Sequence, residues 1–170
     1  MKKLVLLATL IISLSAMAQR PAQPSSSLSI SGQIKQPLTF TIADLDSFTS
    51  KDIGDLAISN HKGEFKKTAK QLKGFLLKTL LEKMEIQTDK PKELSAYYFV
   101  FVANDQYKVV FSWNEIFNTE TGNNLYIITE EDGKKIRDMD ERILLASTKD
   151  FATGRRFIKG LEKIIVMRAE

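Results

Sequence analysis

The stretch that decides the fold is "SAYYFVFVAN", residues 95–104, a run of aromatic and β-branched side chains past the middle of the chain. Such residues favour extended structure, and this run is too apolar for an edge strand. We therefore predict a strand at the centre of a β-sheet. The next segment, "DQYKVVF" at residues 105–111, is predicted to pair with it after a turn at Asn104 and Asp105.

Further strands are indicated by short stretches of apolar and polar alternation bounded by turn residues. The segments are "LSISGQI" (28–34), "LTF" (38–40), "GDLAISN" (54–60), "EFKKTAKQL" (64–72), "NLYIITE" (124–130), "GKKIR" (133–137) and "RILLAST" (142–148). The turn "HKG" joins the third and fourth of these, and Asp132-Gly133 is a hairpin signal. The end of the chain, "RRFIKGLEKIIVM" at residues 155–167, is predicted to be one extended segment.

Three helices are predicted. The main one is "KGFLLKTLLEKM", residues 73–84, whose apolar residues are spaced as on one buried helix face. A short helix should follow Thr41, which has Asp44 three positions later, and another should follow Ser112, which has Glu115 in capping-box spacing. The fold class is therefore α+β, a mixed, barrel-like sheet with one main helix and two short helices on one side.

The N-terminus, "MKKLVLLATLIISLSAMAQ", has two lysines, an apolar run and a small-x-small site before Gln19. This pattern predicts a signal peptide over residues 1–18, too short for a comfortable membrane span. An uncleaved anchor and a buried strand are the alternatives. We expect a flexible Pro/Ser-rich leader at 19–27 and a single domain at 28–170. The mature protein is then exported, periplasmic or secreted, with no membrane span after cleavage.

The amino-acid composition excludes several classes of function. Loss of residues 1–18 removes two lysines and no acid, so the formal charge falls from +4 to +2. Lysines and acids alternate without a basic block, which argues against nucleic acid as a partner. The chain contains no cysteine. This composition excludes thiolate metal sites, cysteine nucleophiles and dithiol redox chemistry.

Catalytic motifs are missing too. The sequence contains no G-x-S-x-G elbow and neither of the common glycine-rich nucleotide-binding patterns. Acidic pairs occur at 130–132 and 138–141, where solvated turns are the ordinary interpretation. We therefore predict no catalytic residue and no metal ligand. His61, the single histidine, lies in the polar turn "SNHKGEF"; one imidazole does not make a metal site, which leaves ligand contact or turn surface.

Two other places could contact a ligand. Asn104 and Asp105 could offer hydrogen bonds to a heterocycle, or they could simply make their turn. Arg155 and Arg156 follow Thr153-Gly154, where two guanidiniums and free N–H groups could hold phosphate or carboxylate. In an extended segment, neighbouring side chains point to opposite faces, so only one arginine would face a given pocket. A solvated turn is the alternative.

The order of these segments resembles the molybdopterin-binding domain of the sulfite oxidase type, in a small, stand-alone, exported form. The matching stretches are "LSISGQIKQPLTFTIADL", "ISNHKGEFKKTAKQLKGFLLKTLL", "VANDQYKVVFSWNEI", "LYIITEEDGKKI" and "RILLASTKDFATGRRFIKGLEKIIV". Together they cover about residues 28–167 in order. The resemblance implies a mixed α+β fold in which loops at one end of the sheet hold a pterin.

The resemblance also implies site residues. His61 falls in the family's turn with a His-x-Gly pattern, and Asn104 to Tyr107 falls on an Asp-Gly-Tyr turn, with Gln106 in place of the usual glycine. Arg155 and Phe157 fall near a closing Arg-aromatic pattern. Catalytic members use a cysteine thiolate to ligate molybdenum, and this chain has none. The family's chemistry is therefore not expected to carry over, whereas the fold is.

Three functional hypotheses follow. The first is a non-catalytic binding module for a small anionic or pterin-like ligand, or for another envelope protein. The second is a molybdopterin-dependent oxidoreductase whose metal is held only by the pterin and by oxygen ligands, with His61, Arg155 and Arg156 contacting the cofactor. The third is a structural envelope or surface-interaction domain that uses only its sheet edge or an exposed patch and has no small-molecule pocket.

Overall fold

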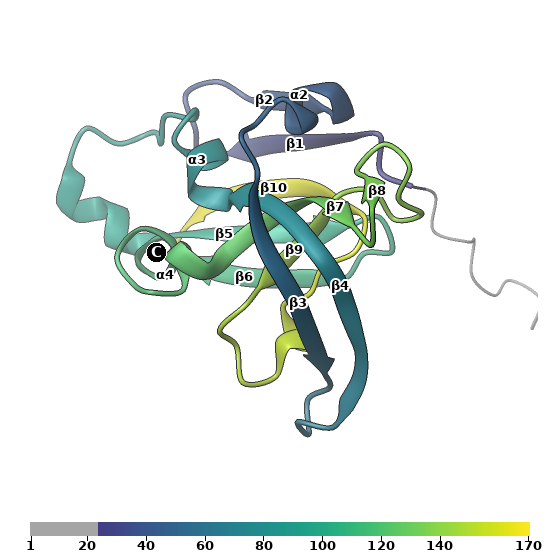
Figure 1. Cartoon of the computed structure of the whole chain (residues 1–170). Coiled ribbons are helices and arrows are strands. Elements are labelled where there is room, and N and C mark those ends of the chain that lie inside the picture. The colour runs from purple at the N-terminus through teal and green to yellow at the C-terminus, as the bar shows by residue number, and fades with distance from the viewer. Residues whose placement is uncertain (1–23) are drawn as a thin grey trace, which may run out of the picture.

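Two sheets share one hydrophobic core in the computed structural model, which describes residues 24–170 (Figure 1). The predicted signal peptide and residues 19–23 of the predicted leader lie outside the described residues. The first strand begins at Ser27, the last residue of the predicted leader. No helix among residues 24–170 is long and apolar enough to cross a membrane.

The first sheet has five strands in the order β2-β1-β10-β5-β6. Their bounds are β1 Ser27–Gly32, β2 Leu38–Thr41, β5 Tyr97–Ala103, β6 Lys108–Ser112 and β10 Leu161–Arg168. Strands β1 and β10 run parallel, and the other neighbours run antiparallel. The predicted strand is confirmed as an interior one, because β5 lies between β10 and β6 and is buried along most of its length, although β10 takes the middle position of the sheet.

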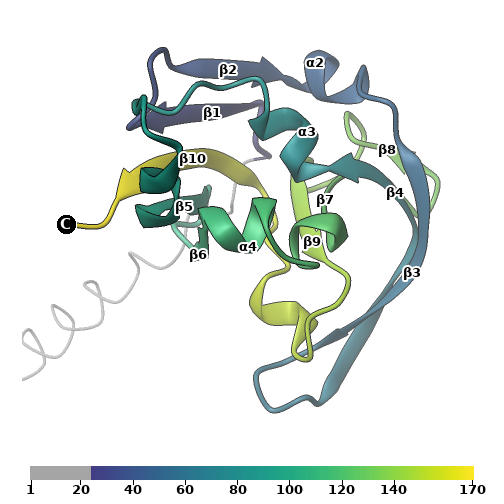
Figure 2. The same cartoon turned by 90° about the vertical axis from the view of Figure 1, so that its left-hand side faces the viewer.

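The second sheet carries a long, curved hairpin that projects from the body of the molecule (Figure 2). Its strands are β3 Lys51–Ser59, β4 Phe65–Leu76, β7 Leu125–Glu131, β8 Lys134–Lys135 and β9 Leu144–Ser147. The order is β3-β4-β7-β8, and β9 also pairs with β7. The predicted hairpins around "HKG" and Asp132-Gly133 are both confirmed.

The helices are all short. They are α2 Ile42–Asp46, α3 Leu77–Leu81 and α4 Trp113–Phe117, with 3-10 turns η2 Pro91–Ala96, η3 Gly122–Asn124 and η4 Thr153–Arg155. Both predicted helix caps form, and both are complete capping boxes: Thr41 accepts from the Asp44 N–H, and Ser112 accepts from the Glu115 N–H. The α+β class is confirmed as mostly sheet with few short helices.

The predicted main helix at 73–84 is wrong. Strand β4 continues to Leu76, so its last residues pair with β7, and only Leu77–Leu81 turn into a helix. Gly74 permits this pairing, because a Cβ there would lie 2.2 Å from the Ile127 carbonyl oxygen. The apolar residues of this segment occupy the end of strand β4 and the single helical turn that follows it. Both are buried against β7.

Two other expectations change. Neither sheet closes on itself, so the barrel-like form is not confirmed. The closing segment is not one extended stretch from Arg155: η4 ends at that residue, Ile158 makes an isolated bridge to Leu145, and β10 begins only at Leu161. Gly160, with φ 62°, separates the bridge from the strand.

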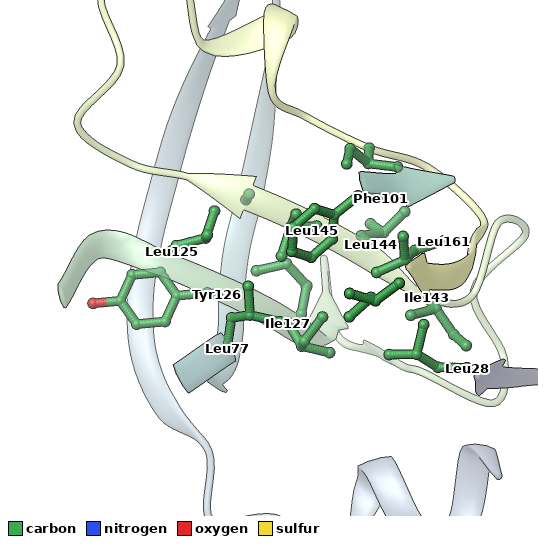
Figure 3. Close-up of a cluster of buried hydrophobic side chains, with 14 of the residues drawn as sticks. Leu28, Leu77, Phe101, Leu125, Tyr126, Ile127, Ile143, Leu144, Leu145 and Leu161 are labelled. Atoms are coloured by element: carbon green, nitrogen blue, oxygen red, sulfur yellow. The ribbon is translucent and has the colours of Figure 1, made fainter. Parts of the chain in front are cut away.

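The core lies between the two sheets, with side chains of both pointing toward one another (Figure 3). Leu28 and Phe101 come from the first sheet, and Ile127 and Leu145 come from the second. All four are fully buried. Because each sheet presents one apolar face, this shared layer leaves the strand ends and connecting loops free to form a site.

Candidate functional site

The β3–β4 hairpin turn forms one wall of the candidate site. Asn60 builds the turn: its side-chain Oδ1 accepts from the N–H groups of Lys62 at 2.9 Å and Glu64 at 3.0 Å. Its Nδ2 also donates to the Glu64 carboxylate at 2.8 Å. The exposed side chain of His61 is therefore carried on a turn with a defined backbone.

The opposite wall is η4, which is attached to the free edge of β3. The Thr153 hydroxyl accepts from the Ser59 N–H at 3.0 Å and donates to the Ala57 carbonyl at 2.7 Å. Gly154 allows close approach, since a Cβ there would lie 2.6 Å from the Ser59 carbonyl oxygen. This contact covers part of an edge strand and fixes the next residue, Arg155, beside the hairpin turn.

Between these walls lies a shallow hollow of about 420 Å³, lined by Ile58, Ser59, Asn60, His61, Lys66, Gly154 and Arg155. It brings His61 and Arg155, two predicted site residues 94 positions apart in the sequence, to one place. The Arg155 guanidinium makes no hydrogen bond or ion pair with any residue from 24 to 170. Lys66 is held only loosely by Glu64 at 3.5 Å. The hollow is therefore lined by positively charged side chains that can still donate hydrogen bonds to a ligand.

Arg156 points into a different environment. Its guanidinium donates to both Asp150 carboxylate oxygens, at 2.6 and 2.5 Å, and to Glu115 at 3.1 Å. It also lies over the Phe111 ring, 4.5 Å from the centroid. These partners, hydrogen bonding to Asp150 first, raise the pKa of Arg156 above its ordinary value. This arginine is occupied and does not line the hollow.

The turn at residues 104–107 is hydrogen-bonded to the loop that carries Arg155. The Asn104 N–H donates to the Gly160 carbonyl at 2.9 Å, and the Asp105 side chain accepts from the Tyr107 N–H at 2.8 Å. The Tyr107 hydroxyl then donates to the Arg155 carbonyl at 2.7 Å. Asn104 and Asp105 are thus used in building the turn, and neither lines the hollow.

Gln106 adopts φ 72°, a left-handed conformation that favours glycine. This is the position where the family resemblance has glycine in its Asp-Gly-Tyr turn. A left-handed residue thus occupies the position at which the resemblance implied glycine.

Sequence reasoning missed Lys66 and Thr153. The hairpin pairing offered a signal for Lys66, because strands joined by a short turn bring residue 66 near residue 59. Thr153 had no such signal: its partners lie 94 and 96 residues away in β3, and no local pattern marks that contact.

A second hollow, of about 430 Å³, lies near β8 but carries balanced charge. Its lining includes Lys67, Lys70, Lys134 and Lys159 together with Glu131, Asp132, Asp140 and Glu141. Within residues 24–170, no group of three or more His, Cys, Asp or Glu side chains is placed to hold a metal ion. The hollow beside Arg155 is therefore the better candidate for a charged ligand.

Comparison with known proteins places the fold. No family model and no curated protein matches the chain. A solved structure of similar fold is the sulfane dehydrogenase SoxCD from Paracoccus pantotrophus, with a TM-score of 0.60 over 89% of this chain at 15% sequence identity. The chain spans 40% of that protein's chain. The likeness shows a shared fold of mixed helix and strand.

The donor set can be tested against a molybdopterin group, which the family resemblance implies. Arg155, Lys66 and His61 suit an anion such as a phosphate or carboxylate. They do not suit a molybdenum ion, because the chain has no cysteine thiolate and the hollow contains one imidazole. The residues therefore fit the anionic part of such a ligand and not a metal centre.

Proposed function

We propose that this chain is a non-catalytic binding module of the sulfite-oxidase-type fold, exported from the cytoplasm, that holds a small anionic ligand beside η4. The observation that carries the proposal is Arg155, which lines the hollow and whose guanidinium has no hydrogen-bond or ion-pair partner among the described residues. The neighbouring Arg156 is fully engaged in ion pairs. A guanidinium without a partner is therefore not a general property of this segment.

Charge and geometry support an anion. A guanidinium binds phosphate or carboxylate through two parallel hydrogen bonds, and Lys66 and His61 can add donors from the facing hairpin. Glu64 is the nearby acid, and its carboxylate is already bonded to Asn60 and Lys66. The hollow is large enough for an anion attached to one heterocycle, consistent with a pterin-like ligand.

A second candidate is a molybdopterin-dependent oxidoreductase that binds its metal only through the pterin. Similarity of fold to a component of a molybdopterin-type oxidoreductase favours it. Purification from an exporting host followed by metal analysis separates the two. Stoichiometric molybdenum together with dye-linked oxidoreductase activity would replace the binding-module proposal with this one.

Arg155→Ala tests the proposal directly. The purified chain is titrated with inorganic phosphate and with folate, a pterin that carries carboxylates, by calorimetry and by thermal shift. We expect saturable binding of at least one probe, with affinity falling about tenfold or more in Arg155→Ala, since a hydrogen bond to a charged group contributes about 1.5–3 kcal/mol. Arg155→Lys should recover part of the loss, because it keeps the charge but not the planar fork.

Arg137→Ala is the matched control. It removes the same charge from an exposed arginine paired with Asp46, away from the hollow. Equal weakening by both variants would indicate general charge attraction instead of a site. Absence of saturable binding by either probe would contradict the proposal and favour a structural domain.

A further inference from the structure

Two phenylalanines project from the end of the molecule that carries the hollow, beyond anything that the proposed ligand requires. Phe151 is fully exposed, at 103% of its reference area, and Phe65 is 64% exposed. Both come from loops at one end, the β3–β4 hairpin and the 148–157 loop, which project together in both views (Figures 1 and 2). Ser59 pairs with Phe65 in the hairpin, and its hydroxyl donates to the Phe151 carbonyl at 3.5 Å.

The exposure of Phe151 is built into the fold. On one side of it, the Asp150 carboxylate accepts from the Ser147 hydroxyl at 2.7 Å and from Arg156. On the other side, Thr153 fixes the chain to β3. The loop is thus held by a partly buried ionic network while the Phe151 side chain stays in water. The Phe151 side chain therefore buries no apolar area within the fold and is available to contact another surface.

Cations surround the two phenylalanines. Segments 59–67 and 147–156 together carry six lysines or arginines and two acids. Both acids are engaged, Asp150 by Arg156 and Glu64 by Asn60 and Lys66. Lys62, Lys149 and Arg155 make no ion pair with any residue from 24 to 170. This surface therefore carries two separate exposed phenylalanine side chains surrounded by positively charged ones.

We propose that this end of the molecule docks on an anionic lipid surface, with Phe65 and Phe151 entering the interface and the lysines and Arg155 meeting the headgroups. Separate aromatic tips suit a lipid interface, which accepts single side chains, better than a protein partner, which needs a continuous buried area. Basic residues beside such tips add attraction to acidic lipids that salt weakens. This docking does not depend on a ligand occupying the hollow.

The test is sedimentation of the chain beginning at Gln19 with vesicles of phosphatidylcholine, with and without phosphatidylglycerol. Binding should require the acidic lipid and weaken as salt rises. Phe151→Ser should weaken partitioning about fivefold or more, and the double variant with Phe65→Ser should weaken it further. Met167→Ser, which changes a 41%-exposed apolar residue at the C-terminal end of β10, is the matched control and should bind as the parent does.

Phosphate and folate titrations of the same variants separate this inference from the proposed function. Phe151→Ser should leave those affinities unchanged, whereas Arg155→Ala should lower them. Vesicle binding that is absent, or that ignores both phenylalanines, would overturn the lipid proposal and leave the binding module standing. Self-association in sedimentation velocity that Phe151→Ser abolishes would also overturn it, because a second copy would then cover the surface.

Discussion

The sequence and the structure lead to different interpretations of the environment of Glu130. In the sequence it belongs to an acidic cluster that suggests a solvated turn. In the structure it lies in β7, with its side chain only 10% exposed between Lys73 at 2.8 Å and Lys135 at 2.6 Å. Hydrogen bonds from Lys135 and then Lys73 lower the pKa of Glu130, outweighing the opposing effect of burial.

We predict that Glu130→Gln lowers the Tm at neutral pH and that the difference from the parent shrinks in acid. A carboxylate whose folded-state pKa is depressed stabilises the fold fully above its ordinary pKa of 4.5, and this contribution is lost as the pH falls through the folded value. Thermal unfolding of both proteins from neutral pH to below 4.5 measures the effect.

The neighbouring residue supplies the control for that experiment. Glu131 is more exposed and lies 4.0 Å from its one lysine, Lys67. Glu131→Gln should therefore change the Tm little at any pH. A Tm difference for Glu130→Gln that stays constant into acid would mean that packing, not ionisation, is responsible.

At the scale of elements, the capping boxes were predictable because their partners lie three residues apart. In α2 the Thr41 hydroxyl and the Asp44 carboxylate bond reciprocally to backbone N–H groups, and Ser112 and Glu115 do the same for α4. The second box has a further link, because Glu115 also accepts from Arg156 at 3.1 Å. That link ties α4 to the loop carrying Phe151.

We predict that Thr41→Ala and Ser112→Ala each lower the free energy of unfolding by about 1 kcal/mol, the usual contribution of a hydroxyl cap. Each hydroxyl also bonds its carboxylate partner, but Ser112→Ala should cost the more of the two, because the Glu115 carboxylate also holds Arg156. Urea unfolding followed by Trp113 fluorescence measures both. Ser95→Ala, an exposed serine in η2, should stay within about 0.5 kcal/mol of the parent.

Elements whose form depends on distant partners were predicted less well. The spacing of the apolar residues Phe75, Leu76, Leu80, Leu81 and Met84 suits a helix face, yet pairing with β7 takes the first two into strand β4. The closing segment likewise looked continuous, but Thr153 and Gly154 dock on β3 and bend it. In both cases a contact across the chain overrides a local preference.

The same limit applies to the site. Residue types alone made His61 and Arg155 candidates, but only the fold shows that they share a hollow and that Arg156 does not. Alternation along a strand could not have decided between the two arginines, because their segment is not a strand. The choice is made by Asp150 and Glu115, which reach Arg156 from the same loop and from α4.

At the scale of the whole molecule, the last strand of the sequence, β10, takes the middle position of the first sheet. β10 lies between β1, to which it is parallel, and β5, to which it is antiparallel, so it joins the two halves of the first sheet. Its residues Leu161, Ile164 and Val166 are fully buried in the shared core. The fold should therefore form only when β10 is present.

We predict that ending the chain after Gly160 abolishes folding, whereas removing only residues 169 and 170 is tolerated. Burial of each of the three apolar side chains contributes about 1.5–3 kcal/mol, and a domain of this size has only about 5–15 kcal/mol in total. Losing β10 also breaks the hydrogen-bonded ladders to β1 and β5. Far-UV circular dichroism and urea unfolding report the outcome; a cooperative transition in the shorter chain would show that the second sheet is stable alone and that the core is not shared.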